Sequence, residues 1–143
     1  MMKRVFAPFI LASLTMPAVA SELTVNITNL NNEKGQVLVA LYNSPEKFPD
    51  ADGKYKGTKI KPLTAKTVST LFTDLPPGKY AVVTYHDEDD NDKLDKSFWG
   101  KPTEQYGFSN NAVPNMGPPS FKDAEFSLSK GQSETINIKL SDK

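Results

Sequence analysis

The sequence of 143 residues contains no cysteine and a single histidine, His86. Without cysteine the chain forms no disulfide, no thiolate metal site and no cysteine nucleophile. One imidazole also excludes a multi-histidine zinc or copper site, and a catalytic triad would need to be built on His86 alone. A metal bound by this protein would therefore have mainly oxygen ligands, which favour calcium, magnesium or manganese over zinc.

Long apolar runs are also missing. The apolar stretch at residues 5–16 is too short to span a bilayer as a helix, and nothing later in the chain is longer or more apolar. It follows Lys3 and Arg4 and is followed by the small residues 18–20, a pattern typical of a secretory signal peptide. We expect residues 1–20 to be removed by cleavage after Ala20, leaving a soluble protein in the periplasm or outside the cell.

The chain has no excess charge of one sign. It carries 17 basic and 17 acidic residues, and the expected leader contains two of the basic residues and none of the acidic ones. The mature part would therefore have a net charge near −2, which gives no electrostatic basis for binding nucleic acid or an anionic membrane. We expect no nucleic-acid partner and no membrane insertion after cleavage.

Alternating apolar and polar residues predict short strands, and no long amphipathic helical pattern follows the leader. The expected strands are residues 23–27, 37–41, 66–75, 79–86, 124–129 and 134–140. The first two are interpreted as a hairpin, and residues 76–78, Pro-Pro-Gly, turn the third into the fourth. Residues 44–48 are expected to form a short helical turn. Six or seven strands predict that residues 21–143 form one antiparallel β-sandwich, immunoglobulin-like or transthyretin-like.

The segment that follows the fourth expected strand, residues 87–95, is unusually acidic. Six of its nine residues, DEDDNDKLD, carry carboxylates, and such a density repels itself unless it is hydrated, paired or wrapped around an ion. The spacing predicts that four side chains converge on a cation, namely Asp87, Asp89, Asn91 and Asp95. Three intervening side chains are expected to face water, namely Glu88, Asp90 and Asp92.

The remainder of this loop fits a calcium loop only in part. Lys93 falls where such loops use a backbone carbonyl as a ligand. Position six is Asp92, where the sharp turn normally requires Gly, and position twelve is Phe98 instead of a bidentate Glu. Glu104 is the next downstream acid and would supply the missing ligand. The alternative is a solvated acidic turn whose side chains hydrogen-bond their own backbone.

A second region of interest is the long segment at residues 97–121, which is rich in Gly, Pro and Asn. It carries four aromatic residues, Trp99, Tyr106, Phe108 and Phe121, in addition to Phe98. Connections of this length are commonly functional or disordered, and burial of the rings favours an ordered loop. We expect the rings, Trp99 included, to close one end of the core. The alternative is that Trp99 and Tyr106 stay partly exposed as a platform for a sugar ring, a peptide or another flat apolar ligand.

Three motifs together resemble a known family. They are H-D-x-D-x-N-x-K-L-D at residues 86–95, G-x-P-x-E-x-Y-G-F-S-N-N-A at residues 100–112 and G-P-P-S-F-x-D-A-x-F at residues 117–126. The sequence resembles the uncharacterised exported bacterial proteins grouped as DUF 2141, over essentially the whole mature chain. The resemblance implies a periplasmic or secreted β-sandwich of a Gram-negative bacterium, and it brings no known activity.

Three classes of function are compatible with these features. The favoured one is a non-enzymatic binding or accessory module in which a calcium ion ties the acidic segment to the long loop. A second is a carboxylate-based hydrolase that uses Asp87, Asp89 or Glu104 as acid and base, with His86 nearby. The sequence has no nucleophile elbow, phosphate loop or ordered triad that would support it. The third is an interaction module whose sheet edge or exposed aromatics engage another envelope protein.

Overall fold

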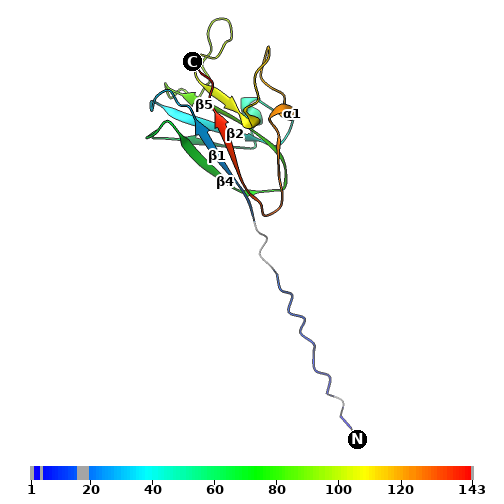
Figure 1. Cartoon of the computed structure of the whole chain (residues 1–143). Helices are drawn as coiled ribbons and strands as arrows, with labels where there is room; N and C mark the ends of the chain where they lie inside the picture. Colours follow the sequence, from blue (N-terminus) through cyan, green and yellow to red (C-terminus); the bar gives the residue numbers. More distant parts are fainter. Residues whose placement is uncertain (1, 4, 16–19, 143) are drawn as a thin grey trace.

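The computed structural model describes residues 2–3, 5–15 and 20–142. Residues 5–15 have no helix or strand and lead away from a folded domain that begins at Ser21 (Figure 1). Residues 18 and 19 of the expected cleavage site lie outside the described residues. No helix in the described part of the chain has the length and apolar character needed to cross a membrane.

The domain is built almost entirely from strands. Those within the described residues are β1 (Ser21–Thr28), β2 (Gln36–Tyr42), β3 (Lys56–Ile60), β4 (Val68–Leu75), β5 (Gly78–Asp87), β6 (Tyr106–Phe108), β7 (Phe126–Leu128) and β8 (Ser133–Lys139). Three short helical segments accompany them, η1 (Ala51–Gly53), η2 (Ser109–Asn111) and α1 (Phe121–Ala124). The predicted β-sandwich is confirmed.

Two sheets form the sandwich. One has three strands in the order β4-β1-β8, and the other has five, in the order β3-β2-β5-β6 with β7 also paired to β5. The pairs are antiparallel except for β1 and β8, which run parallel. A strand that closes the chain therefore lies beside the strand that opens the domain, and the two ends of the domain sequence are joined in one sheet.

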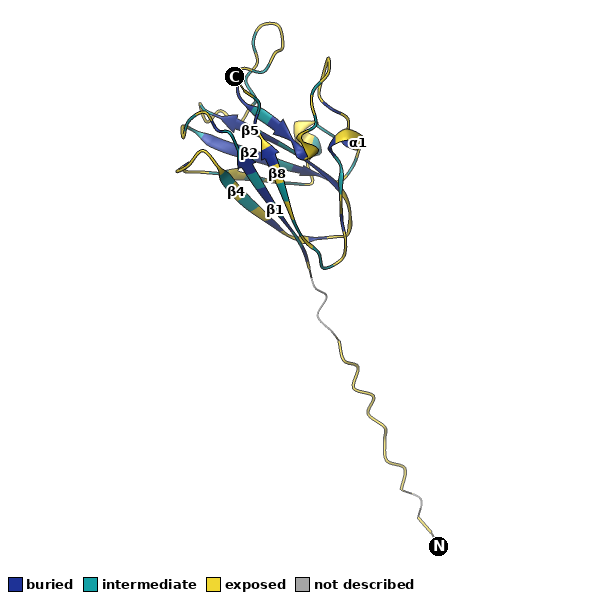
Figure 2. Cartoon of the chain, in the orientation of Figure 1, coloured by how far each residue is buried: buried dark blue, intermediate teal, exposed yellow. Residues whose placement is uncertain are grey.

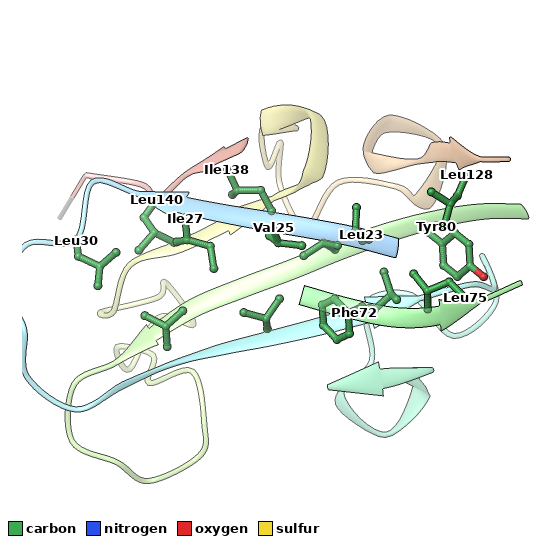
Figure 3. Packing of buried hydrophobic residues seen from close by; sticks show 14 of the residues in the cluster. Leu23, Val25, Ile27, Leu30, Phe72, Leu75, Tyr80, Leu128, Ile138 and Leu140 are labelled. Atoms are coloured by element: carbon green, nitrogen blue, oxygen red, sulfur yellow. The ribbon is translucent and has the colours of Figure 1, made fainter. Parts of the chain in front are cut away.

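The core lies between the two sheets, as Figures 2 and 3 show. The alternating apolar residues of β1 and β2 are all at most 2% exposed: Leu23, Val25, Ile27, Val37, Val39 and Leu41. Each such side chain contributes about 1.5–3 kcal/mol by leaving water. The period-two pattern in the sequence thus identifies the buried face of both strands correctly.

The predicted hairpin between the first two strands is wrong, because β1 and β2 belong to different sheets. Alternation indicates which face of a strand is buried and carries no information on its partner. The seven residues between β1 and β2 cross from one sheet to the other. The chain crosses again between β4 and β5, where the buried Tyr80 donates its hydroxyl hydrogen bond to the carbonyl oxygen of Pro76.

The sequence did not predict β3, β6 or α1. The β3 sequence, KGTKI, has one strongly apolar residue and three polar or charged ones, so it lacks the alternation of a half-buried strand. Residues 45–49, which overlap the expected helical turn, form hydrogen-bonded turns that do not extend into a helix. The helix α1 begins at a capping box in which Ser120 and Asp123 exchange side-chain and backbone hydrogen bonds.

A second apolar cluster covers one end of the outer face of the five-stranded sheet. It joins Tyr42 of β2 and Ala81 of β5 to Phe121 and Ala124 of α1. The ring of Phe48 lies edge-on to Tyr42, with the ring centroids 5.2 Å apart. The long segment after β6 is therefore ordered by packing on this face, while the other end of the same face remains open.

Candidate metal site

The acidic loop begins where β5 ends. Asp87, the last residue of β5, is fully buried, and the chain then turns sharply through Asp90 and Asp92, which have φ values of 57° and 62°. Asp and Asn tolerate this left-handed conformation better than other non-glycine residues. The sharp turn at which calcium loops normally have Gly is therefore made by an aspartate, Asp92.

Hydrogen bonds fix the carboxylate of Asp87. Its Oδ2 accepts from Gln36 Nε2 at 2.7 Å and from the backbone N–H of Asp92 at 2.8 Å, and its Oδ1 accepts from the N–H of Asn91 at 3.2 Å. Burial raises the pKa of Asp87, but these donors outweigh it and hold the pKa below its ordinary value. Asp87 is therefore a preorganised, ionised carboxylate at the base of the loop.

Glu104 joins the acidic loop to the segment that leads into β6. Its side chain is buried, and its two oxygens accept the backbone N–H groups of Glu88 at 3.0 Å and Asp95 at 3.1 Å. The neighbouring Gln105 is fully buried and donates its amide to the carbonyl oxygens of Asn29 and Ser141. The position of Glu104 is thus set by both the loop it spans and the core behind it.

Three carboxylates converge at this place. One oxygen each from Asp87, Asp89 and Glu104 lies within 4.8 Å of the others. Calcium ligands lie 2.3–2.6 Å from the ion, so two of them on opposite sides are about 5 Å apart. The separations therefore fit a single ion of this size. Sequence spacing predicted Asp87 and Asp89, and the need for one more acid predicted Glu104.

Desolvation, together with the crowding of negative charge, raises the pKa values of Asp89 and Glu104. Desolvation, contact with the carboxylates of Asp95 and Asp87, and the charge of Asp95 raise the pKa of Asp89 to about 6. Desolvation also raises the pKa of Glu104, against the lowering effect of its two N–H donors. Either a proton or a bound cation would relieve this repulsion.

The two remaining predicted side-chain ligands pair with each other. Asn91 Nδ2 donates to Asp95 Oδ1 at 2.6 Å, while Asn91 Oδ1 accepts the backbone N–H of Lys93 at 3.0 Å. Asp95 also contacts the carboxylate of Asp89, so it stays beside the three converging acids. Asn91 directs its oxygen into the loop's own backbone. A ligand role for the Lys93 carbonyl stays a prediction.

Two of the acids that were expected to face water, Asp90 and Asp92, form salt bridges with lysines. Asp90 Oδ2 lies 2.7 Å from Lys61 Nζ, and Asp92 Oδ1 lies 2.8 Å from Lys59 Nζ, with all four side chains at least 40% exposed. Such exposed ion pairs contribute about 0–1 kcal/mol. Glu88 is half-buried, because its backbone N–H is drawn inward to Glu104.

His86 is fully buried and has a structural partner. Its Nε2 lies 2.6 Å from the carbonyl oxygen of Lys34, so this nitrogen carries the proton and donates it. The bond holds the turn before β2 against the end of β5. The hydrolase alternative places His86 near the acid and base, and His86 does adjoin Asp87 in the chain, with its side chain fully buried.

The aromatic segment divides into a buried and an exposed part. Phe108 and Phe121 are buried and Tyr106 is half-buried, as expected. The expectation that Trp99 closes the core is wrong, since Trp99 is 89% exposed and Phe98 is 93% exposed. Their rings meet edge-to-face, with the ring centroids 5.3 Å apart. The alternative, in which Trp99 and Tyr106 form a ligand platform, stays a prediction, with Tyr106 half-buried beside Tyr85 on the sheet.

Comparison with known proteins identifies the family alone. No curated protein and no solved structure matches this chain at a significant level. The profile of one family, described as an uncharacterized protein conserved in bacteria (DUF2141), matches residues 25–137. That range spans both sheets and includes the acidic loop and Glu104. The chain therefore belongs to the DUF2141 family, as its three motifs indicated.

Proposed function

We propose that this protein is an exported, non-enzymatic β-sandwich module in which one calcium ion ties the acidic loop to the segment before β6. The observation that carries the proposal is the convergence of Asp87, Asp89 and Glu104 within 4.8 Å. Asp87 is the last residue of β5, Asp89 lies in the acidic loop, and Glu104 lies just before β6. An ion bound to all three would hold these parts of the chain together.

The donor chemistry favours calcium over other divalent ions. The converging groups are all carboxylates, which suit calcium, magnesium and manganese. Magnesium requires near-ideal octahedral geometry, whereas calcium accepts six to eight oxygens in flexible arrangements completed by water. Several oxygens of Asp87 and Glu104 are also engaged by N–H donors. We therefore expect weak binding, with Kd of roughly 10⁻⁴ to 10⁻³ M as in extracellular modules.

The same contacts argue against a hydrolase. An acid–base pair needs one carboxyl group that can exchange a proton with a substrate in a cleft. Both oxygens of Glu104 instead accept backbone N–H groups, and the His86 imidazole is buried against Lys34. These groups are committed to holding the loop, which supports a binding or accessory role.

Export is supported by the place where the fold starts. Ser21 is buried. Its hydroxyl donates a hydrogen bond to the carbonyl oxygen of Ser129 at 2.8 Å and accepts one from the backbone N–H of Gly131 at 2.9 Å. Residues 5–15 are exposed and contribute no strand. Cleavage after Ala20 would therefore remove the leader and leave the first strand and its anchor intact.

A calcium titration followed by amide chemical shifts tests the proposal. In the folded protein we expect saturable shifts centred on residues 88–95 and on Glu104 and Gln105. Asp89→Asn should abolish them, whereas Asp90→Asn, which changes an exposed partner of Lys61, should preserve them. Shifts that are absent, that never saturate or that spread evenly over the surface would contradict a specific site.

A further inference from the structure

The open end of the five-stranded sheet has an ordered arrangement of side chains. Strand register places Lys59, Leu38, Tyr85 and Tyr106 in one row across β3, β2, β5 and β6. The next row is Gly57, Ala40, Val83 and Phe108. Side chains of one row project from the same face of a sheet. This face is opposite the core, because Val37, Val39 and Leu41 alternate with Leu38 and Ala40.

The middle of this face is hollow. Gly57, Ala40 and Val83 are small, while Leu38, Tyr85, Tyr106 and Phe108 stand around them, and together they line a groove of about 820 Å³. Small-molecule sites in proteins typically have volumes of about 300–1,000 Å³ and apolar walls with a few polar groups. The groove has both properties, and sequence reasoning missed it because its floor comes from four separate strands.

Loops raise the walls of the groove. The acidic loop supplies Lys93 and Leu94 to the lining, the segment before β6 supplies Pro102, and the segment after β6 supplies Pro114 and Pro118. Prolines lower the entropy that a loop loses on ordering. A wall built in this way is largely formed before a ligand enters, which favours binding.

The charged residues that line the groove are mainly basic. Its lining includes four lysines, Lys54, Lys59, Lys93 and Lys96, and one acid, Asp92. Asp92 is paired with Lys59. Within the described residues, no salt bridge is formed by Lys93 or Lys96, and the Nζ of Lys54 donates to a carbonyl oxygen, that of Ala51. An apolar floor is thus bordered by two lysines, Lys93 and Lys96, that form no salt bridge among the described residues.

We propose that this groove binds an amphipathic anion, a ligand with a flat apolar body and one negatively charged group. The body would lie on Ala40 and Val83 between the rings of Tyr85, Tyr106 and Phe108. The anionic group would reach Lys93 and Lys96, which line the same groove. The site is distinct from the cation site, because Asp87, Asp89 and Glu104 are not among the residues that line the groove.

Naphthalene-2-sulfonate is a suitable probe, with naphthalene-2-methanol as its uncharged analogue. Followed by amide shifts in the folded protein, the sulfonate should bind saturably and perturb Leu38, Ala40, Val83 and Tyr106. The neutral analogue should bind the same residues about tenfold more weakly, because it lacks the charge that the lysines attract. Running both titrations in chelator keeps the result independent of the cation site.

Two sets of variants locate the site. Ala40→Phe fills the floor and should weaken sulfonate binding at least about tenfold. Lys93→Gln with Lys96→Gln should reduce the preference for the sulfonate over the alcohol to about twofold or less. The double variant Lys122→Gln with Lys130→Gln makes the same change in net charge at exposed positions outside the groove and should leave that preference unchanged.

The shift mapping on unsubstituted protein keeps the test valid should Ala40→Phe fail to fold. Sulfonate shifts confined to other surfaces, or equal affinities for the two probes, would overturn the proposal. It would also be overturned if sedimentation showed a dimer at the titration concentrations and the groove amides were shielded there, since a second copy of the chain would then be the occupant.

Discussion

Gln36 Nε2 donates to Asp87 Oδ2 at 2.7 Å, which connects the first residue of β2 to the last residue of β5. Both side chains are buried, with Gln36 5% exposed and Asp87 fully buried. A neutral amide therefore stabilises a charged group at the base of the candidate metal site. The same nitrogen lies 2.7 Å from Asp92 Oδ1, so one side chain supports two acids of the loop.

Replacing this donor should destabilise the fold. Gln36→Leu keeps a similar volume but leaves the buried Asp87 carboxylate with one fewer hydrogen bond, at a cost of about 1–3 kcal/mol. Urea unfolding measures the change. Asn26→Ala serves as the control, because its amide donates to Asn137 in an exposed pair that should contribute less than about 1 kcal/mol. Equal losses in the two variants would show that Gln36 does not support the loop in this way.

The pKa of Asp89 predicts how pH and calcium compete. Its folded-state pKa of about 6 exceeds the ordinary value of 3.8, so between these values the folded state holds more protons than the unfolded chain. In chelator, the Asp89 contribution should therefore lower stability as pH rises from about 4 to about 6. Calcium affinity should change in the opposite direction, weakening as pH falls below about 6.

Titrations with calcium at about pH 7.5, 6 and 5 check this dependence. Asp87 has the reverse shift, and its favourable contribution is lost only as pH falls below 3.8, so it does not obscure the window. An affinity for calcium that is the same across this range would show that Asp89 is not a ligand. Asp89→Asn provides the matched protein without the titrating group.

Substitution of two glycines, Gly35 and Gly100, separates the cost of close packing against the end of β5 from the cost of a left-handed backbone conformation. Gly35 and Gly100 have similar φ values, 68° and 78°, but a Cβ at Gly35 would lie 2.1 Å from the carbonyl oxygen of Asp87, whereas at Gly100 no described atom lies within 4 Å. Gly100→Ala should cost about 1–2 kcal/mol for its left-handed conformation. Gly35→Ala should cost roughly 2–4 kcal/mol more, because the backbone must shift. Similar unfolding midpoints for the two variants would contradict the contact.

The fluorescence of Trp99 tests whether this part of the long segment, residues 97–121, is exposed. As Trp99 is 89% exposed and contacts Phe98, its fluorescence in the folded protein should resemble that of tryptophan in water and be quenched freely by acrylamide. Trp99→Ala should change stability by no more than about 0.5 kcal/mol. A blue-shifted emission that moves on unfolding would show instead that the ring packs in a core, as the composition of the segment suggested.

The strands could be predicted from sequence because alternation is local. Residues such as Leu23, Val25 and Ile27 reveal their buried face without reference to any partner. Strand pairing could not be predicted in this way. The partners of β1 are β4 and β8, whose paired residues lie more than forty residues away in the chain. The parallel pair of β1 and β8 has no local signal at all.

The charged residues of the candidate site could be predicted from sequence, whereas its neutral residues could not. Asp87, Asp89 and Glu104 could be identified because carboxylates at close spacing require compensation. Gln36 and Gln105 were missed, because a neutral amide has no charge that must be balanced and its burial depends on the tertiary fold. The exposure of Trp99 could not be predicted either, because the aromatic composition of a segment does not indicate which of its rings packs in a core.

Thermal unfolding of the protein in excess calcium and in chelator, at fixed ionic strength, tests the central claim most directly. Calcium at about 100 times Kd should stabilise the fold by about 2.7 kcal/mol, a rise in melting temperature of roughly 5–15 °C. Asp89→Asn should remove the shift and Asp90→Asn should retain it. Coincident melting curves of the unsubstituted protein under the two conditions would contradict the account and leave residues 87–95 as an acidic turn held by its own hydrogen bonds.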